Sequence, residues 1–163
     1  MINKLLKDEA FSQMMADHAA DTLDLLLEMQ SPFGVLCNLS MVHFDPPLPQ
    51  ELRDAFKPLT FFLLNGFTLE SAELDEEMLY LSFEAGFGED NFGSVVTIPT
   101  DAILQIIIDE SVIFLNLCAT VTPKKGQRPK ESSQPGSGSL EHSIRSFLSN
   151  PENEKFLKSD PKK

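Results

Sequence analysis

The densest group of chemically reactive side chains in this sequence is an acidic run, formed by Glu73, Asp75, Glu76 and Glu77. Paired carboxylates can transfer protons or bind a metal ion when they converge on one point. Neighbouring carboxylates in a turn instead point in different directions and are usually solvated. The chain also has no Gly-x-Ser-x-Gly, no Walker loop and no His-Glu-x-x-His. We therefore expect no catalytic site and a protein that is not an enzyme.

Cysteine and histidine form no metal-binding pattern either. Cys37 and Cys118 lie in apolar, strand-like segments, where a cysteine is usually a small buried hydrophobe. The three histidines, His18, His43 and His142, are scattered and lack the spacing of zinc ligands. We predict no metal and no cofactor.

Charge divides the chain into two unlike parts. Residues 1–122 carry 4 basic and 20 acidic side chains, a net charge of −16, whereas residues 123–163 carry 9 basic and 5 acidic ones, a net charge of +4. So acidic a body repels the phosphate backbone, and we expect no nucleic-acid partner. Its field favours basic or amine-bearing partners.

No apolar run approaches the roughly 18 to 20 residues that span a bilayer. The start of the chain lacks the apolar core and the cleavage site of a signal peptide. We expect no membrane partner and a cytoplasmic location. A chain of 163 residues is long enough for one domain with a real core.

The elements follow from hydrophobic periodicity. Apolar side chains recur every three or four residues from Phe11 to Met29, with no Gly or Pro before Pro32, which predicts a helix over 8–30. A sheet should occupy 33–119. The sequence predicts strands over 33–44, 59–65, 67–74, 79–87, 95–98 and 113–117. It predicts helical turns over 49–56 and 99–105.

Short antiparallel strands with connections of a few residues form a strongly bent sheet or a small barrel. The sequence therefore predicts an α+β fold that is mainly β, in which the long N-terminal helix packs against the sheet. We expect one domain over residues 1–122 and a flexible basic tail over 123–163, because residues 123–139 contain no large apolar side chain that could offset the entropy of ordering.

Apolar side chains return near the end of the tail. Leu140, Ile144, Phe147 and Leu148 share one face of a short helix, and Phe156-Leu157-Lys158 follows. This end is either a frayed terminus or a short docking motif on a flexible arm. The docking residues would be Ile144, Phe147, Leu148, Phe156, Leu157 and Lys158.

Five fragments, in order, resemble the protease-adaptor family of stringent starvation protein B (SspB), especially its alphaproteobacterial type. They are 48–53 (Leu-Pro-Gln-Glu-Leu-Arg), 59–65 (Leu-Thr-Phe-Phe-Leu-Leu-Asn), 79–83 (Leu-Tyr-Leu-Ser-Phe), 96–103 (Val-Thr-Ile-Pro-Thr-Asp-Ala-Ile) and 109–114 (Asp-Glu-Ser-Val-Ile-Phe). The resemblance covers roughly residues 20–118. It implies a Sm-like or SH3-like bent sheet, a homodimer formed through the first helix, and delivery of ssrA-tagged proteins to the ClpX ATPase of the ClpXP protease.

The resemblance also assigns sites. An extended peptide needs apolar pockets for alternate side chains and polar groups for its backbone. The residues that would line the peptide groove are Leu63, Leu64, Asn65, Gly66, Phe67, Phe83, Glu84, Ala85, Gly86, Phe87, Val95 and Val96. Each apolar member could instead belong to the core, because alternation does not say which row faces a groove. The loop 88–93 is longer and more acidic than the family's turn, so the preferred tag sequence could differ.

The apolar surface of the first helix is wider than packing on one small sheet requires. Dimerisation would use Met15, His18, Thr22 and Leu26; the alternative is that the protein's own core occupies this whole surface. A further class of function is a structural or chaperone-like module that uses this helix to hold a partner, without a protease.

Overall fold

The computed structural model describes residues 1–121. The predicted tail, with Ile144, Phe147, Leu148, Phe156, Leu157 and Lys158, lies outside the described residues. The helices, 3-10 helices (η) and strands are, in chain order, α1 (Ile2–Leu5), α2 (Glu9–Met29), β1 (Phe33–Asn38), η1 (Leu39–Met41), β2 (His43–Asp45), α3 (Gln50–Ala55), β3 (Leu59–Leu64), α4 (Gly66–Glu70), β4 (Glu73–Leu74), β5 (Tyr80–Phe87), β6 (Phe92–Pro99), η2 (Thr100–Ala102), β7 (Ile103–Ile108), β8 (Ser111–Leu115) and η3 (Leu117–Thr120).

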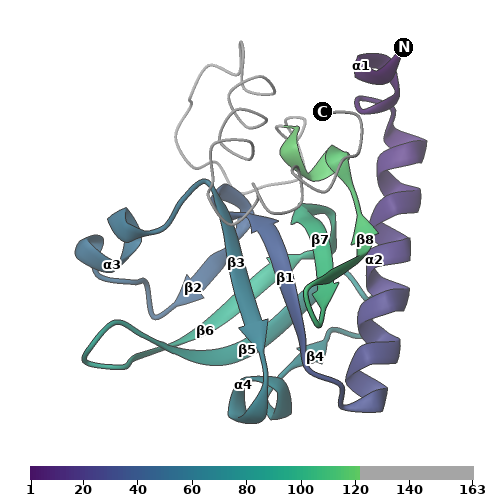
Figure 1. The fold of residues 1–163 in the computed structure, drawn as a ribbon. Helices are drawn as coiled ribbons and strands as arrows, with labels where there is room; N and C mark the ends of the chain where they lie inside the picture. Colours follow the sequence, from purple (N-terminus) through teal and green to yellow (C-terminus); the bar gives the residue numbers. More distant parts are fainter. Residues whose placement is uncertain (122–163) are drawn as a thin grey trace.

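The strands form two four-stranded antiparallel sheets. Sheet A has the order β3-β1-β7-β8, and sheet B has the order β2-β6-β5-β4. The sheets pack face to face with their strands crossing at a steep angle (Figure 1). The fold is therefore α+β. The alternative of a small closed barrel is wrong, because the edge strands of one sheet do not pair with those of the other.

Helix and strand contents are about equal in the described residues, so the prediction of a mainly β protein is also wrong. The helix content is higher than predicted partly because of residues 67–74, which were predicted to form one strand. This segment forms α4 and then the two-residue β4. Gly66 starts α4 with a φ of 48°, a left-handed conformation that suits glycine.

The long helix agrees with its prediction. The Asp8 side chain caps α2 by accepting a hydrogen bond from the Phe11 backbone N–H at 2.9 Å, and Gln30 ends the helix with a φ of 54°. The helix lies along one side of the molecule (Figure 1), where it contacts β4 of sheet B, β7 of sheet A and the connecting η2. Its buried face carries Ala19, Leu23 and Leu26.

The core fills the space between the sheets. Its inner rows include Phe33, Val35, Phe62 and Leu64 from sheet A, and Leu81, Phe83, Val96 and Ile98 from sheet B. Among residues 1–121, no helix combines the length and the apolar character that crossing a bilayer requires.

Two strand boundaries differ from the prediction for physical reasons. The segment 33–44 is interrupted by η1, where Asn38 accepts a hydrogen bond from the Ser40 backbone N–H at 3.2 Å, and the chain changes sheets. The helical turns predicted over 99–105 are confined to η2 (Thr100–Ala102), and β7 begins at Ile103. β7 is apolar except for Gln105 and is buried from Ile103 to Ile107 at the centre of sheet A, so its sequence shows no alternation of apolar and polar residues.

The core position Leu23 and the surface position Leu25 make a matched test of this packing. Both lie inside the C-terminal half of α2, but Leu23 is 0% exposed and Leu25 is 55% exposed. Leu23→Ala should lower the free energy of unfolding by about 2–5 kcal/mol, because it leaves a cavity. Leu25→Ala has the same helix-propensity change and should alter stability by less than about 0.5 kcal/mol. Urea unfolding followed by circular dichroism measures both; equal losses would contradict the packing described.

Candidate functional site

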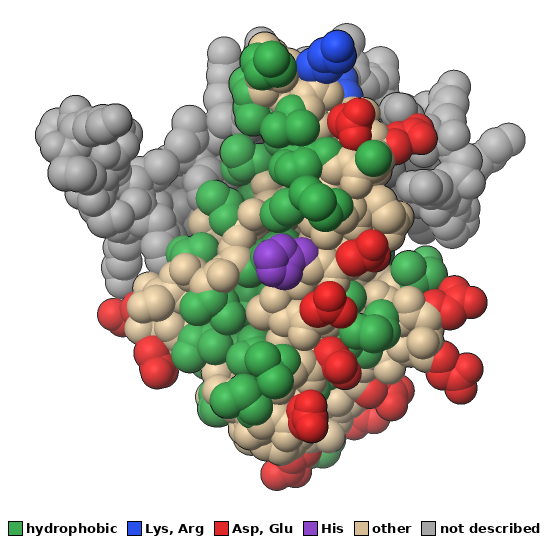
Figure 2. Space-filling model, turned by 90° about the vertical axis from the view of Figure 1, so that its right-hand side faces the viewer, with side chains coloured by type: hydrophobic (Ala, Val, Ile, Leu, Met, Phe, Trp, Pro, Cys, Tyr) green, Lys and Arg blue, Asp and Glu red, His purple; other side chains and the backbone are tan. Residues whose placement is uncertain are grey.

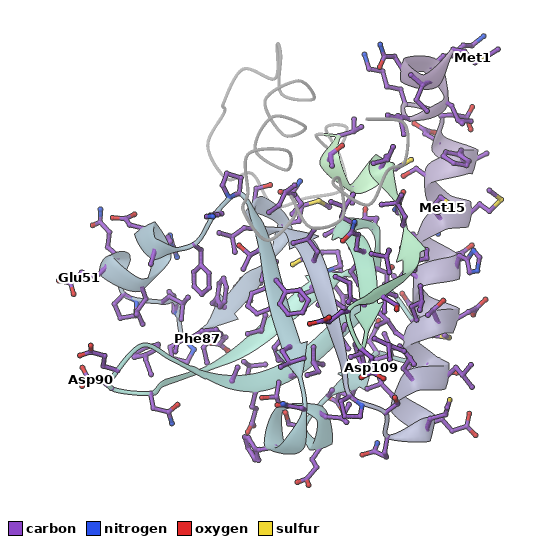
Figure 3. The ribbon with its side chains drawn as sticks, viewed as in Figure 1. Met1, Met15, Glu51, Phe87, Asp90 and Asp109 are labelled. Carbon is purple, nitrogen blue, oxygen red and sulfur yellow. The ribbon has the colours of Figure 1, made fainter. Side chains whose placement is uncertain are left out.

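Five phenylalanine rings join the two sheets at the end of the molecule away from α2. They come from β2, the residue after α3, β3 and β5, with neighbouring centroids 5.8 to 6.4 Å apart: Phe44, Phe56, Phe62, Phe83 and Phe87. Phe87 lies between α3 and the end of the β5–β6 hairpin (Figure 3). Leu52 of α3 lies against the same hairpin, because a Cβ added at Gly88 would be 2.6 Å from its Cδ2 atom.

The residues predicted for the peptide groove divide between the two faces of sheet B. Phe83, Ala85 and Phe87 alternate on the face of β5 that turns toward sheet A, and Phe83 is opposite the buried Val96 of β6. Phe83 and Val96 are core residues at 1% and 0% exposure, whereas Ala85 and Phe87 are only half-buried. The inner face of the hairpin is therefore less covered near its tip.

The other members lie on the outer face of sheet B. Glu84, Gly86 and Val95 are exposed, and Glu84 is opposite Val95 in the register of β5 and β6. Side chains on opposite faces of one sheet cannot line the same groove. The structure thus brings Ala85 and Phe87 together and separates them from Glu84, Gly86 and Val95.

The remaining members lie at the end of β3. Leu64 is in the core at 0% exposure, whereas its neighbour Leu63 is 54% exposed on the outer face of sheet A. Asn65, Gly66 and Phe67 are exposed where β3 leads into α4.

The two sheets have four edges, and three are poorly suited to pairing with another strand. β2 has three residues and is followed by Pro46 and Pro47, β4 has two residues, and the pairing of β8 with β7 contains a register shift. β3 has six residues, Leu-Thr-Phe-Phe-Leu-Leu, and pairs regularly with β1 over its full length. Proteins usually protect edge strands by shortness, charge, proline or bulges, and β3 has none of these.

The backbone groups on the open side of β3 can be assigned. The Leu39 N–H donates to the Pro58 carbonyl oxygen at 2.9 Å. Because hydrogen-bonded pairs recur at every second residue of an antiparallel ladder, Thr60, Phe62 and Leu64 turn their N–H and C=O groups toward β1. The groups of Leu59, Phe61 and Leu63 therefore point away from it.

Phe61 and Phe62 of β3 were not among the predicted site residues. The available signal was the run Leu59–Leu64, an apolar strand with no charged residue or proline. That run did not indicate that β3 would be an edge strand of its sheet.

The predicted dimerisation residues divide between the core and the surface of the protein. Leu26 is in the core at 5% exposure and Met15 is half-buried against it. His18 is exposed and Thr22 is half-buried, and the His18 ring meets the edge of Phe114 from β8 with centroids 5.9 Å apart. The most exposed apolar side chains of α2 are not among the predicted dimerisation residues: Met14, Leu25 and Met29.

These exposed side chains form one surface, which we call the α2 stripe: Met14, His18, Leu25 and Met29. It continues onto the exposed Ile113 of β8, next to Phe114, whose ring meets His18. Figure 2 shows hydrophobic side chains gathered along this side of the molecule, with acidic side chains along one flank. The acidic flank of the helix consists of Asp17, Asp21, Asp24 and Glu28.

The reactive side chains have structural roles. Asp75 Oδ1 accepts hydrogen bonds from the backbone N–H groups of Leu79 and Tyr80 at 2.7 and 2.8 Å, so this carboxylate holds the turn before β5. No group of three or more possible metal ligands occurs within residues 1–121. Burial raises the pKa values of both Cys37 and Cys118, which keeps the thiols protonated and unreactive.

Comparison of the chain with models of known protein families gives no match, and comparison with curated proteins gives no significant match.

Proposed function

We propose that this protein is a non-enzymatic, SspB-like adaptor that binds ssrA-like degradation tags and delivers the tagged cargo to ClpXP. The observation that carries the proposal is the open edge of β3 beside the half-buried Ala85 and Phe87. An extended peptide requires this combination, because strand addition satisfies its backbone while neighbouring pockets select its side chains.

In this proposal the tag forms an added strand next to β3. Its backbone bonds the outward N–H and C=O groups of Leu59, Phe61 and Leu63, and Asn65 bonds a further peptide amide. Ala85 and Phe87 contact the tag side chains that point toward the hairpin. Two antiparallel sheets with a long helix support the finer assignment of a Sm-like fold, which we include in the proposal.

The proposal extends to a cytoplasmic homodimer. The α2 stripe and the adjoining part of β8 are an exposed apolar surface of the kind that marks an interface. The same observation favours the second candidate function, a structural or chaperone-like module in which the stripe holds a different protein and no protease takes part.

Leu63→Pro tests strand addition directly. It removes an N–H group that makes no bond to β1, and proline is tolerated at such an edge position. A fluorescent peptide ending in an ssrA-like sequence should bind about three- to tenfold more weakly to Leu63→Pro than to Leu63→Ala, because one hydrogen bond contributes about 0.5–1.5 kcal/mol. Fluorescence anisotropy measures both affinities.

The control for a general surface effect is Val95→Ala. Val95 lies on the outer face of sheet B, away from Ala85 and Phe87, so this change should leave the affinity for the tag peptide unchanged. A scrambled peptide should not bind. The tag-receptor proposal would be refuted by equal, weak binding of the tag and the scrambled peptide to the unmodified protein.

Truncation after Thr122 tests the tail as a tether. Tag binding should persist, because the proposed site lies within residues 59–87, whereas ClpXP should degrade the tagged cargo more slowly. A flexible tether raises the local concentration of cargo at the protease, typically to the millimolar range. Degradation assays with and without the truncated protein measure the effect; an unchanged rate excludes a delivery role for the tail.

Leu25→Glu tests the homodimer without disturbing the core, since Leu25 is 55% exposed whereas a charge at Leu26 would enter the core. It should convert the dimer to a monomer, measured by sedimentation equilibrium. Asp24→Ala, on the acidic flank, should remain dimeric. If the unmodified protein is a monomer, the homodimer is refuted, and the structural or chaperone-like module becomes the function proposed for the α2 stripe.

A further inference from the structure

The outer face of sheet A is apolar across all four strands, with Gln105 as an exception in the rows below. One cross-strand row is formed by Leu63, Gly34, Ile107 and Val112, and the next row by Phe61, Leu36, Gln105 and Leu115. The members on the edge strands are exposed, Leu63 by 54%, Phe61 by 37%, Val112 by 37% and Leu115 by 48%, whereas the central members Leu36, Gln105 and Ile107 are 2%, 3% and 9% exposed.

The outer face of sheet B is different. Its corresponding row consists of His43, Thr97, Ser82 and Glu73, from β2, β6, β5 and β4. An antiparallel sheet with one solvated face normally alternates apolar residues inside with polar residues outside, as sheet B does. Sheet A has the composition of a sheet covered on both faces, and a sheet face is usually covered by a helix.

Part of the cover is the chain that follows β8. Ala119 of η3 packs with Leu36, Leu59 and Leu104, and Asn38 Nδ2 donates to the Ala119 carbonyl oxygen at 3.1 Å. The chain therefore leaves the described structure on the outer face of sheet A, immediately beside the two apolar rows.

A buried polar group lies in the same place. Gln105, in the row between Leu36 and Leu115, is 3% exposed, and its Oε1 atom accepts no hydrogen bond within the described residues. A buried acceptor without a partner costs about 1–3 kcal/mol, and the buried Asn116 Nδ2 also has no partner within the described residues. Both atoms are already shielded from solvent, so the need for a cover comes from the exposed Phe61, Leu63, Val112 and Leu115.

We propose that residues 140–148 of the same chain cover the outer face of sheet A. Leu140, Ile144, Phe147 and Leu148 have the spacing of one helix face, and Ser143, Arg145 and Ser146 in the same segment supply donors. Nine helical residues are about 13 Å long, and four strands span about 15 Å. Residues 122–139 can extend about 60 Å, so the connection reaches any part of this face.

The contact would be intramolecular and would not depend on a second copy or on the tag. It has one regulatory consequence. Ile144, Phe147 and Leu148 cannot contact sheet A and a protease at the same time, so docking to a partner would require release of the segment.

The full-length chain contains no tryptophan, so Phe147→Trp introduces a single reporter. We expect its emission to be blue-shifted relative to a peptide of residues 138–150 carrying the same Trp, at every protein concentration. Adding Leu115→Glu, on β8, should shift the emission to that of the free peptide, whereas adding Leu25→Glu, on the α2 stripe, should not change it.

Each other outcome overturns the proposal. Emission equal to that of the free peptide in the Phe147→Trp protein means that the segment does not pack on the domain. A blue shift that Leu25→Glu removes places the segment on α2 instead. A shift that grows with protein concentration means a contact between copies. Circular dichroism of each variant confirms that the sheets are retained, and tag affinity, measured separately, reports on the proposed function.

Discussion

Phe62 lies at the junction of the two sheets, where its ring contacts those of Phe44, Phe56, Phe83 and Phe87. These contacts hold β3 against sheet B, while β1 alone pairs with its backbone. The inner side chains of β3 are therefore committed to the core, and the other edge of its backbone is not used within the domain. Burial of one aromatic row thus stabilises the fold and at the same time leaves an ordered strand edge.

The helix α2 shows a similar division of roles around its circumference. One face packs into the core through small and aliphatic side chains, a second is apolar but exposed beside β8, and a third is acidic. The acidic face disfavours close approach of another acidic surface, whereas the α2 stripe does not. A partner that binds α2 should therefore approach from the side of β8.

Some elements could be predicted because their signals are local. The Asp8 cap and the spacing from Phe11 to Met29 define α2, and the alternation from Leu79 to Phe87 defines β5. Other elements depend on burial or on long-range contacts. β7 is apolar at every position but Gln105 and is buried from Ile103 to Ile107. The break at η1 involves a contact between Asn38 and Ala119, which are 81 residues apart in sequence. Around the candidate site, alternation identified the two rows of β5, but it could not say that Phe83 faces the core while Glu84 faces outward, or that Val96 of β6 is buried while Val95 is exposed.

The sequence by itself determined the acidic character of the body, the long capped helix and the antiparallel strands, because these depend on composition and on periodicities of two and 3.6 residues. Only the tertiary structure decided that the strands form two crossed sheets, that β3 has the one long unprotected edge among residues 1–121, and that Leu26 is core while Leu25 is surface. The physical reason is that packing between apolar rows of the two sheets sets the order of the strands and decides which side chains of each strand face the core. Those contacts join residues far apart in the chain and leave no local pattern.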